Sequence, residues 1–128
     1  MTYEETLHYL YTSIPVFQHS GASAYKPGLG TSIALDDYLG NPHKAYKTIH
    51  VAGTNGKGSV SHLLAAILRQ SGFKVGLYTS PHLVDFRERI RVNGKKISQD
   101  YVVDFVERHR SFFEPLHPSF FELTSSMA

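Results

Sequence analysis

Hydrophobic residues in the middle of the chain recur at helical spacing. Val60, Leu63, Leu64, Ile67 and Leu68 stand at i, i+3, i+4, i+7 and i+8. This spacing predicts an amphipathic helix that buries one apolar stripe. Gly72 follows the last apolar position, where a glycine commonly ends a helix.

Similar patterns predict helices near both ends of the chain. Thr2 and Glu5 have the spacing of a capping box, which places a helix start at about Tyr3. Pro15 should end this helix, and the glycines and prolines that follow make residues 16–31 a loop. The predicted helices of this kind cover Tyr3–Thr12, Ser32–Leu39, Gln99–Phe113 and Ser119–Ala128.

Two short apolar runs flank the central helix and are typical of buried strands. They are Thr48–Ala52 and Lys74–Thr79. A strand, a helix and a second strand form a βαβ unit, which we expect to be parallel and right-handed. Its ligand site should lie beyond the carboxyl ends of the strands. Farther along, Asn93-Gly94 between Arg89–Val92 and Lys95–Ile97 predicts a β-hairpin.

The turn between the first strand and the central helix is rich in glycine. Such a turn points backbone N–H groups inward, the helix start adds a positive dipole, and a lysine reaches the terminal phosphates of a polyphosphate. The standard pattern G-x-x-x-x-G-K-[ST] would place glycine at position 51 and a hydroxyl at position 58, where this chain has Val51 and Gly58. Either Ser59 or another loop must therefore supply the Mg²⁺ ligand. The predicted ATP-binding residues are Gly53, Thr54, Asn55, Gly56, Lys57, Gly58 and Ser59.

Composition narrows the class of protein. The 128 residues suffice for one domain with a core, and the hydrophobic content of 41% is ordinary for a globular protein. A net charge of +2 gives no argument for a nucleic-acid partner. There are no cysteines, and the eight histidines form no H-x-x-x-H pair, which argues against a zinc site. Without a signal peptide or an apolar run long enough to span a membrane, we expect a cytoplasmic protein with no membrane partner.

Four stretches together resemble a known enzyme family. They are G-T-N-G-K-G-S at 53–59, T-S-P-H-L at 79–83, E-R-I-R-V-N-G at 88–94 and F-F-E-L-T at 120–124. Their sequence and order resemble the folylpolyglutamate synthases, including the bifunctional dihydrofolate synthases, which are ATP-dependent amide ligases related to the Mur ligases. The likeness covers most of the chain from Leu35 onward.

The resemblance implies a fold and a domain organisation. The fold would be a three-layer α/β P-loop fold with a parallel sheet, like the central domain of Mur ligases, carrying a small β-hairpin. Residues 1–128 would be the N-terminal portion of the ATP-binding domain. The rest of that domain, with its metal-binding glutamate, and the C-terminal domain that helps to hold glutamate would lie outside this fragment. The fragment alone would then be inactive, and we expect the full-length protein to be a monomer.

The resemblance also implies a reaction and residue roles. ATP would phosphorylate the carboxylate of folate or dihydropteroate, and the amine of L-glutamate would displace the phosphate, releasing ADP and phosphate. Lys57 would be the catalytic contact to the β- and γ-phosphates, and Ser80 would be the Mg²⁺ ligand. Phe121 and Glu122 match a segment that lines the pteroate pocket, and His82 is a further candidate for contact with the ligand.

Structural alternatives accompany several of these candidates. Ser80 could cap the turn at Pro81, and His82 could be a hydrogen-bonded structural histidine. Glu122 would also suit the first turn of a helix. A solvated hairpin face is the favoured interpretation of the arginines at positions 89 and 91. For the aromatic residues Phe112, Phe113, Phe120 and Phe121, a core role is favoured over pterin stacking.

Two other functions stay open from the sequence. One is a Mur-type peptidoglycan ligase, against which the S-P-H-L turn and the E-R-I-R-V-N-G hairpin argue. The other is a nucleotide-binding module without ligase chemistry. The motifs do not separate a folylpolyglutamate synthase from a bifunctional dihydrofolate synthase.

Overall fold

The computed structural model describes residues 1–14 and 28–128, which form two compact units. Of these, residues 1–14, 28–47 and 99–127 belong to the first, which we call the helical unit. Residues 48–98 and Ala128 belong to the second, which we call the hairpin unit. Pro15, which was predicted to end the first helix, and most of the predicted loop at 16–31 lie outside the described residues. Within the described ranges, no helix combines the length and apolar character needed to cross a membrane.

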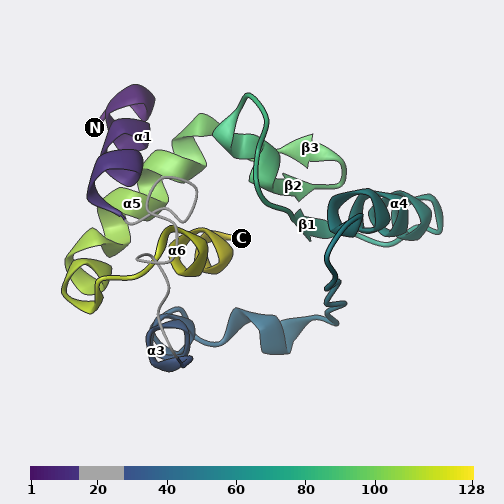
Figure 1. Cartoon of the computed structure of the whole chain (residues 1–128), viewed down its shortest axis with the longest axis horizontal. Helices are drawn as coiled ribbons and strands as arrows, with labels where there is room; N and C mark the ends of the chain where they lie inside the picture. Colours follow the sequence, from purple (N-terminus) through teal and green to yellow (C-terminus); the bar gives the residue numbers. More distant parts are fainter. Residues whose placement is uncertain (15–27) are drawn as a thin grey trace. The chain divides into compact units, whose positions relative to one another are not determined.

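Helices α1, α3, α5 and α6 build the helical unit (Figure 1). Helix α1 packs against α5, and α3 packs against α6. Their inward residues form an apolar core, in agreement with the predicted helical patterns. The helices are α1 (Tyr3–Ser13), α3 (Gly30–Tyr38), α5 (Gln99–Phe113) and α6 (Phe120–Met127), with short 3₁₀ turns at Pro42–Ala45 and Glu114–Leu116. The buried core side chains include Leu10, Leu35, Val102, Val106, Phe113, Leu123 and Met127.

Side chains cap two of these helices at their N-termini. At α1 the Glu5 N–H donates to Thr2 Oγ1 at 3.1 Å, and the Thr2 N–H donates to the Glu5 carboxylate at 2.7 Å. This confirms the predicted capping box. Helix α6 has the same reciprocal arrangement between Ser119 and Glu122, with distances of 3.0 and 3.1 Å.

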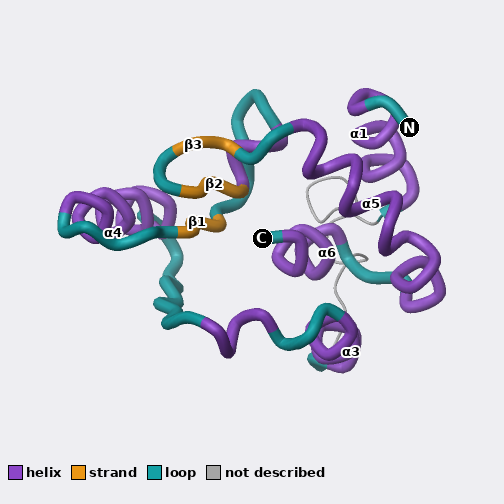
Figure 2. The backbone as a smooth tube through the Cα atoms, turned by 180° about the vertical axis from the view of Figure 1, so that it is seen from behind, coloured by secondary structure: helices purple, strands orange, loops and turns teal. Residues whose placement is uncertain are grey.

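The hairpin unit contains helix α4 (Lys57–Gln70) and three short strands, β1 (Gly76–Tyr78), β2 (Ile90–Val92) and β3 (Lys95–Lys96). The strands are drawn in orange in Figure 2 and form one antiparallel sheet in the order β1-β2-β3. A 3₁₀ turn at Phe86–Arg89 leads into β2. Asn93 and Gly94 join β2 to β3 with positive φ angles of 50° and 78°, which confirms the predicted hairpin turn.

The predicted parallel strand pair is not present among the described residues. Thr48–Ala52 forms no strand, and β1 pairs antiparallel with β2 instead. Parallel strands are stable when both faces of the sheet are covered. Here Ile49 of the predicted first strand is exposed, so no such sheet encloses it. The predicted mixed α/β class is confirmed. The prediction of a parallel βαβ unit is wrong for the described residues.

Helix α4 forms as predicted, but its apolar stripe is not buried. Val60, Leu63 and Ile67 are all exposed, with 64% of Leu63 accessible to solvent. None of the residues in α4 is buried. Gly72 follows the helix with φ of 94°, and its N–H donates to the Arg69 carbonyl, as expected for a C-terminal glycine.

Candidate functional site

The glycine-rich loop delivers an open helix N-terminus. Gly56 is the N-cap of α4 with φ of 77°, in the left-handed region that suits glycine. No side chain caps the helix, and its first turn contains no acidic residue. The first N–H groups of a helix have no partner within the helix and carry the positive end of its dipole. The geometry therefore suits an anion such as a phosphate group.

The predicted catalytic lysine lies directly against this loop. Lys57 is the first residue of α4, and its Nζ donates a hydrogen bond to the Gly53 carbonyl at 2.6 Å. A lysine ammonium has three donors, so two more are available for phosphate oxygens. The structure thus brings Gly53 and Lys57 together, and both belong to the predicted ATP-binding set. The whole stretch from Gly53 to Ser59 is exposed.

The second predicted stretch follows strand β1. The Thr79 N–H donates to the Arg89 carbonyl at 2.9 Å, which continues the pairing of β1 with β2. Ser80, the predicted metal ligand, is exposed and precedes Pro81. His82 is half-buried, and its Nδ1 accepts a hydrogen bond of 2.8 Å from Arg89 Nε. The structural alternative for His82 is therefore confirmed, and its contact with a ligand stays a prediction.

The predicted solvent exposure of Arg89 is wrong. The hairpin was expected to present Arg89 to solvent, yet the residue is only 4% exposed. It stands at the end of the 3₁₀ turn beside the buried Phe86 and Ile90, and its guanidinium turns toward His82. Alternation along β2 did not show this, because the partner lies seven residues earlier on another loop.

The surroundings of His82 favour a neutral imidazole. Burial lowers the pKa of His82, and the positive charge of Arg89 lowers it further. The carboxylates of Glu88 and Asp85 act in the opposite direction without reversing the shift. Because Arg89 Nε can only donate, Nδ1 must be the acceptor and Nε2 carries the ring proton.

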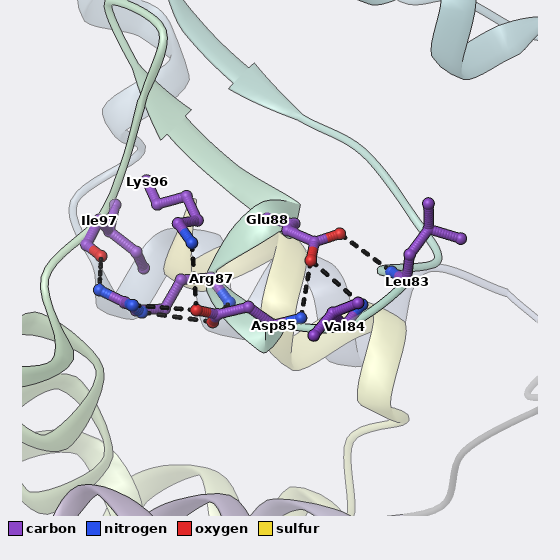
Figure 3. A network of polar contacts seen from close by, with 7 residues as sticks. All are labelled: Leu83, Val84, Asp85, Arg87, Glu88, Lys96 and Ile97. Carbon is purple, nitrogen blue, oxygen red and sulfur yellow. Dashed lines mark hydrogen bonds and ion pairs between the residues drawn. The ribbon is translucent and has the colours of Figure 1, made fainter.

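A carboxylate that the sequence analysis did not identify holds the loop after His82. Glu88 accepts hydrogen bonds from the backbone N–H groups of Leu83 at 3.0 Å, Val84 at 3.1 Å and Asp85 at 2.7 Å (Figure 3). These bonds, above all the one from Asp85, lower the pKa of Glu88 to about 2. Asp85 and Glu88 are spaced like Thr2 and Glu5, so the capping-box pattern could have identified them.

Asp85 extends this network to the hairpin. It pairs with Arg87 at 2.9 Å and with Lys96 of β3 at 3.2 Å. Arg87 Nη1 also donates to the Ile97 carbonyl at 3.4 Å. The segment after β1 is thereby tied by charged side chains to the β3 end of the β2–β3 hairpin.

Two of the three predicted substrate residues lie in the helical unit. Phe121 is exposed on α6, so the core role favoured for it is wrong, and Glu122 belongs to the capping box with Ser119. The helix-start interpretation of Glu122 is thus confirmed, while its contact with a substrate stays a prediction. Phe113 and Phe120 are buried as predicted for core residues, and Phe112 stacks on Tyr38 with ring centroids 3.8 Å apart.

Mg²⁺ would have to bind with few protein ligands from the described residues. In residues 1–14 and 28–128, no group of three or more His, Cys, Asp or Glu side chains could hold a metal ion. Mg²⁺ commonly binds through one or two protein oxygens together with substrate phosphates and water. A single hydroxyl such as that of Ser80 fits this kind of site.

Comparisons with known proteins give a consistent set of relatives. No family model matches the chain. A probable bifunctional folylpolyglutamate synthase/dihydropteroate synthase of Haloferax volcanii is 39% identical over 135 residues, covering 100% of this chain and 15% of that protein. The crystal structure of a folylpolyglutamate synthase from Thermotoga maritima superposes with a TM-score of 0.85 and 45% identity, covering 98% of this chain and 29% of that one.

A solved complex of a folylpolyglutamate synthase with AMPPCP and folate is also similar. Its TM-score is 0.82 with 32% identity, and the match covers 100% of this chain and 31% of that one. The chain therefore spans less than a third of the length of each of these relatives.

Proposed function

Since the chain belongs to the family of folylpolyglutamate and dihydrofolate synthases, we propose that it forms part of the ATP site of a ligase that joins L-glutamate to folate. The site residues are Lys57 with the loop Gly53–Ser59 for the phosphates, Ser80 for Mg²⁺, and Phe121, Glu122 and His82 for the pterin substrate. A bifunctional protein would also accept dihydropteroate.

One observation carries this proposal, namely the position of Lys57 over an uncapped helix start. Its Nζ lies 2.6 Å from the Gly53 carbonyl, at the N-terminus of a 14-residue helix. A phosphate placed on the exposed N–H groups would meet the ammonium as well as the helix dipole. The similarity to a complex with an ATP analogue and folate supports the identity of the anion.

The reaction needs positioning and charge neutralisation more than covalent help from the protein. The γ-phosphoryl group of ATP moves to a carboxylate oxygen of the pterin substrate, and ADP leaves. The amine of glutamate then attacks the carbonyl carbon, loses a proton, and releases inorganic phosphate with formation of the amide bond. Lys57 and the loop N–H groups neutralise charge on the transferring phosphoryl group.

Ser80 would hold Mg²⁺ through its hydroxyl. This would compensate for Gly58, which stands where many related loops have a hydroxyl. When bound, Mg²⁺ neutralises the β- and γ-phosphate charge. The neutral imidazole of His82 lies two residues beyond Ser80 and carries its ring proton on Nε2.

Residues 1–128 would supply only the N-terminal portion of the ATP-binding domain. The relatives are more than three times as long. This length leaves room for the rest of the ATP-binding domain and for a C-terminal domain that holds glutamate. We infer that the complete protein is monomeric. The names of the relatives do not favour the Mur-type peptidoglycan ligase or a nucleotide module without ligase chemistry.

The test is ADP release by the full-length protein with Mg·ATP, glutamate and either tetrahydrofolate or dihydropteroate. ADP release that requires both glutamate and a pterin substrate supports the ligase. Acceptance of tetrahydrofolate alone would indicate a folylpolyglutamate synthase, and acceptance of dihydropteroate as well would indicate a bifunctional enzyme. Lys57→Ala should lower the rate at least about 100-fold, because it removes a stabilising charge from the transferring phosphoryl group.

Lys74→Ala is the matched control, since Lys74 is exposed in the same unit but lies outside the loop. It should retain the rate of the wild type. Ligation without dependence on a pterin, or normal turnover by Lys57→Ala, would contradict the proposal.

A further inference from the structure

The segment from Ser80 to Asp85 is held in place with little help from apolar burial. Leu83 and Val84 are each 91% exposed, so their side chains do not anchor the backbone. Exposed loops without buried side chains usually sample several conformations. A single conformation here must therefore come from polar contacts.

Glu88 makes the polar contacts that fix the backbone. One carboxylate accepts the three successive N–H groups of Leu83, Val84 and Asp85, within 2.7–3.1 Å. Hydrogen bonds to an ionised acceptor are stronger than those between neutral groups. The close-up in Figure 3 shows the Glu88 side chain reaching across to all three residues.

Arg89 makes the contact that fixes the imidazole. It is nearly buried, its carbonyl accepts the Thr79 N–H, and its Nε donates to His82 Nδ1 at 2.8 Å. The rings of His82 and Phe86 also form a T-shaped contact, with centroids 6.1 Å apart. Arg89 thus ties the segment at Thr79 and at His82, on both sides of Ser80.

We propose that Glu88 and Arg89 are positioning residues of the ligase site, which hold the Ser80 hydroxyl and the His82 imidazole in the geometry that the reaction needs. The inference rests on the proposed function. Neither residue needs to touch ATP or the pterin, because each acts through the segment 80–85. Groups that orient the ligands of a metal or substrate commonly change activity by 10- to 100-fold when they are replaced.

The first experiment compares Glu88→Gln with Glu4→Gln in the full-length protein. Both substitutions remove one carboxylate charge, but Glu4 is exposed on α1 and its carboxylate makes none of the side-chain hydrogen bonds found among the described residues. In Glu88→Gln, the amides of 83–85 should exchange hydrogen about tenfold faster, while those of α5 stay unchanged. The activation constant for Mg²⁺ should rise about tenfold while the KM for glutamate stays the same.

The second experiment uses Arg89→Met, which keeps the long side chain and removes the donor. Nitrogen NMR of labelled histidine should show His82 in the wild type with an unprotonated Nδ1 and a protonated Nε2. In Arg89→Met this preference should be lost and kcat should fall about tenfold, with partial recovery in Arg89→Lys. Arg108→Met, on the exposed surface of α5, is the control and should leave both readouts unchanged.

Several results would overturn the inference. One is amide exchange in Glu88→Gln equal to that in Glu4→Gln. Another is wild-type His82 with a proton on Nδ1, and a third is full activity in both variants. A wild type that does not ligate glutamate would refute the proposed function instead. The exchange rates and the imidazole spectrum would then still decide whether Glu88 and Arg89 position the segment.

Discussion

The helical unit and the hairpin unit both contain amphipathic helices, but only the helical unit buries their apolar faces. In α5 and α6, Val102, Val106 and Leu123 have no accessible surface. In α4 the corresponding stripe is open, with Leu63 and Ile67 mostly exposed. The comparison shows that apolar periodicity identifies a helix and the face that it can bury. It does not show whether the residues that would pack on this face lie within the 128-residue chain.

The helix starts differ in the same way. Helices α1 and α6 use the side chains of Thr2 and Ser119 to satisfy their first N–H groups. Helix α4 begins at Gly56 without a side-chain cap. A helix that serves stability uses a cap worth about 1 kcal/mol, whereas a helix that binds an anion leaves its first N–H groups for the ligand.

The largest expected contrast is between Leu123→Ala and Leu63→Ala. Leu123 is fully buried in the helical unit, so its truncation should cost about 3 kcal/mol of unfolding free energy. Leu63→Ala makes the same chemical change on an exposed helix face and should cost less than about 0.5 kcal/mol. Urea denaturation of both variants, followed by circular dichroism, measures the difference.

These measurements use the 128-residue chain. An equal cost for the two variants would contradict the contrast, because it would mean that the α4 stripe is covered in this chain. In the full-length protein, a larger cost for Leu63→Ala would show that later residues cover the stripe.

The parts of the fold that depend on neighbouring residues were predictable from the sequence. The boundaries of α5, the capping box at Thr2 and the turn at Asn93-Gly94 all follow from local patterns. The predicted strand at Thr48–Ala52 failed because a strand needs a partner, and the sequence pattern does not show which segment pairs with it.

In the candidate site, too, the local features were predictable and those that depend on strand pairing were not. The loop around Lys57 was predicted because its chemistry lies within seven consecutive residues. The role of Arg89 was missed because its partner His82 is brought to it only by the pairing of β1 with β2. The Glu88 network was local and could have been recognised from its capping-box spacing.

A smaller contrast compares Ser119→Ala with Ser59→Ala. The Ser119 hydroxyl caps α6, so its loss should cost about 1 kcal/mol. Ser59 lies in the first turn of α4, where no side chain acts as the cap, so the same substitution should change stability by less than about 0.5 kcal/mol. Thermal unfolding of the two variants measures this difference, and a similar loss in Ser59→Ala would show that its hydroxyl stabilises the loop.

The smallest expected effect is local and depends on pH. The pKa of Glu88 is lowered to about 2 from an ordinary value near 4.5. Its contribution to the stability of the folded state is therefore complete above about pH 4.5 and is lost as the pH falls toward 2. In the helical unit, burial and a hydrogen bond to Glu114 raise the pKa of Tyr9 to about 12. The contribution of Tyr9 to the stability of the folded state is complete below about pH 10 and is lost as the pH rises toward 12. Amide NMR should therefore show residues 83–85 changing on the acid side, while the α1 amides around Tyr9 change on the alkaline side. Glu88→Gln should abolish the acid transition at 83–85, and a transition that persists in this variant would assign it to Asp85.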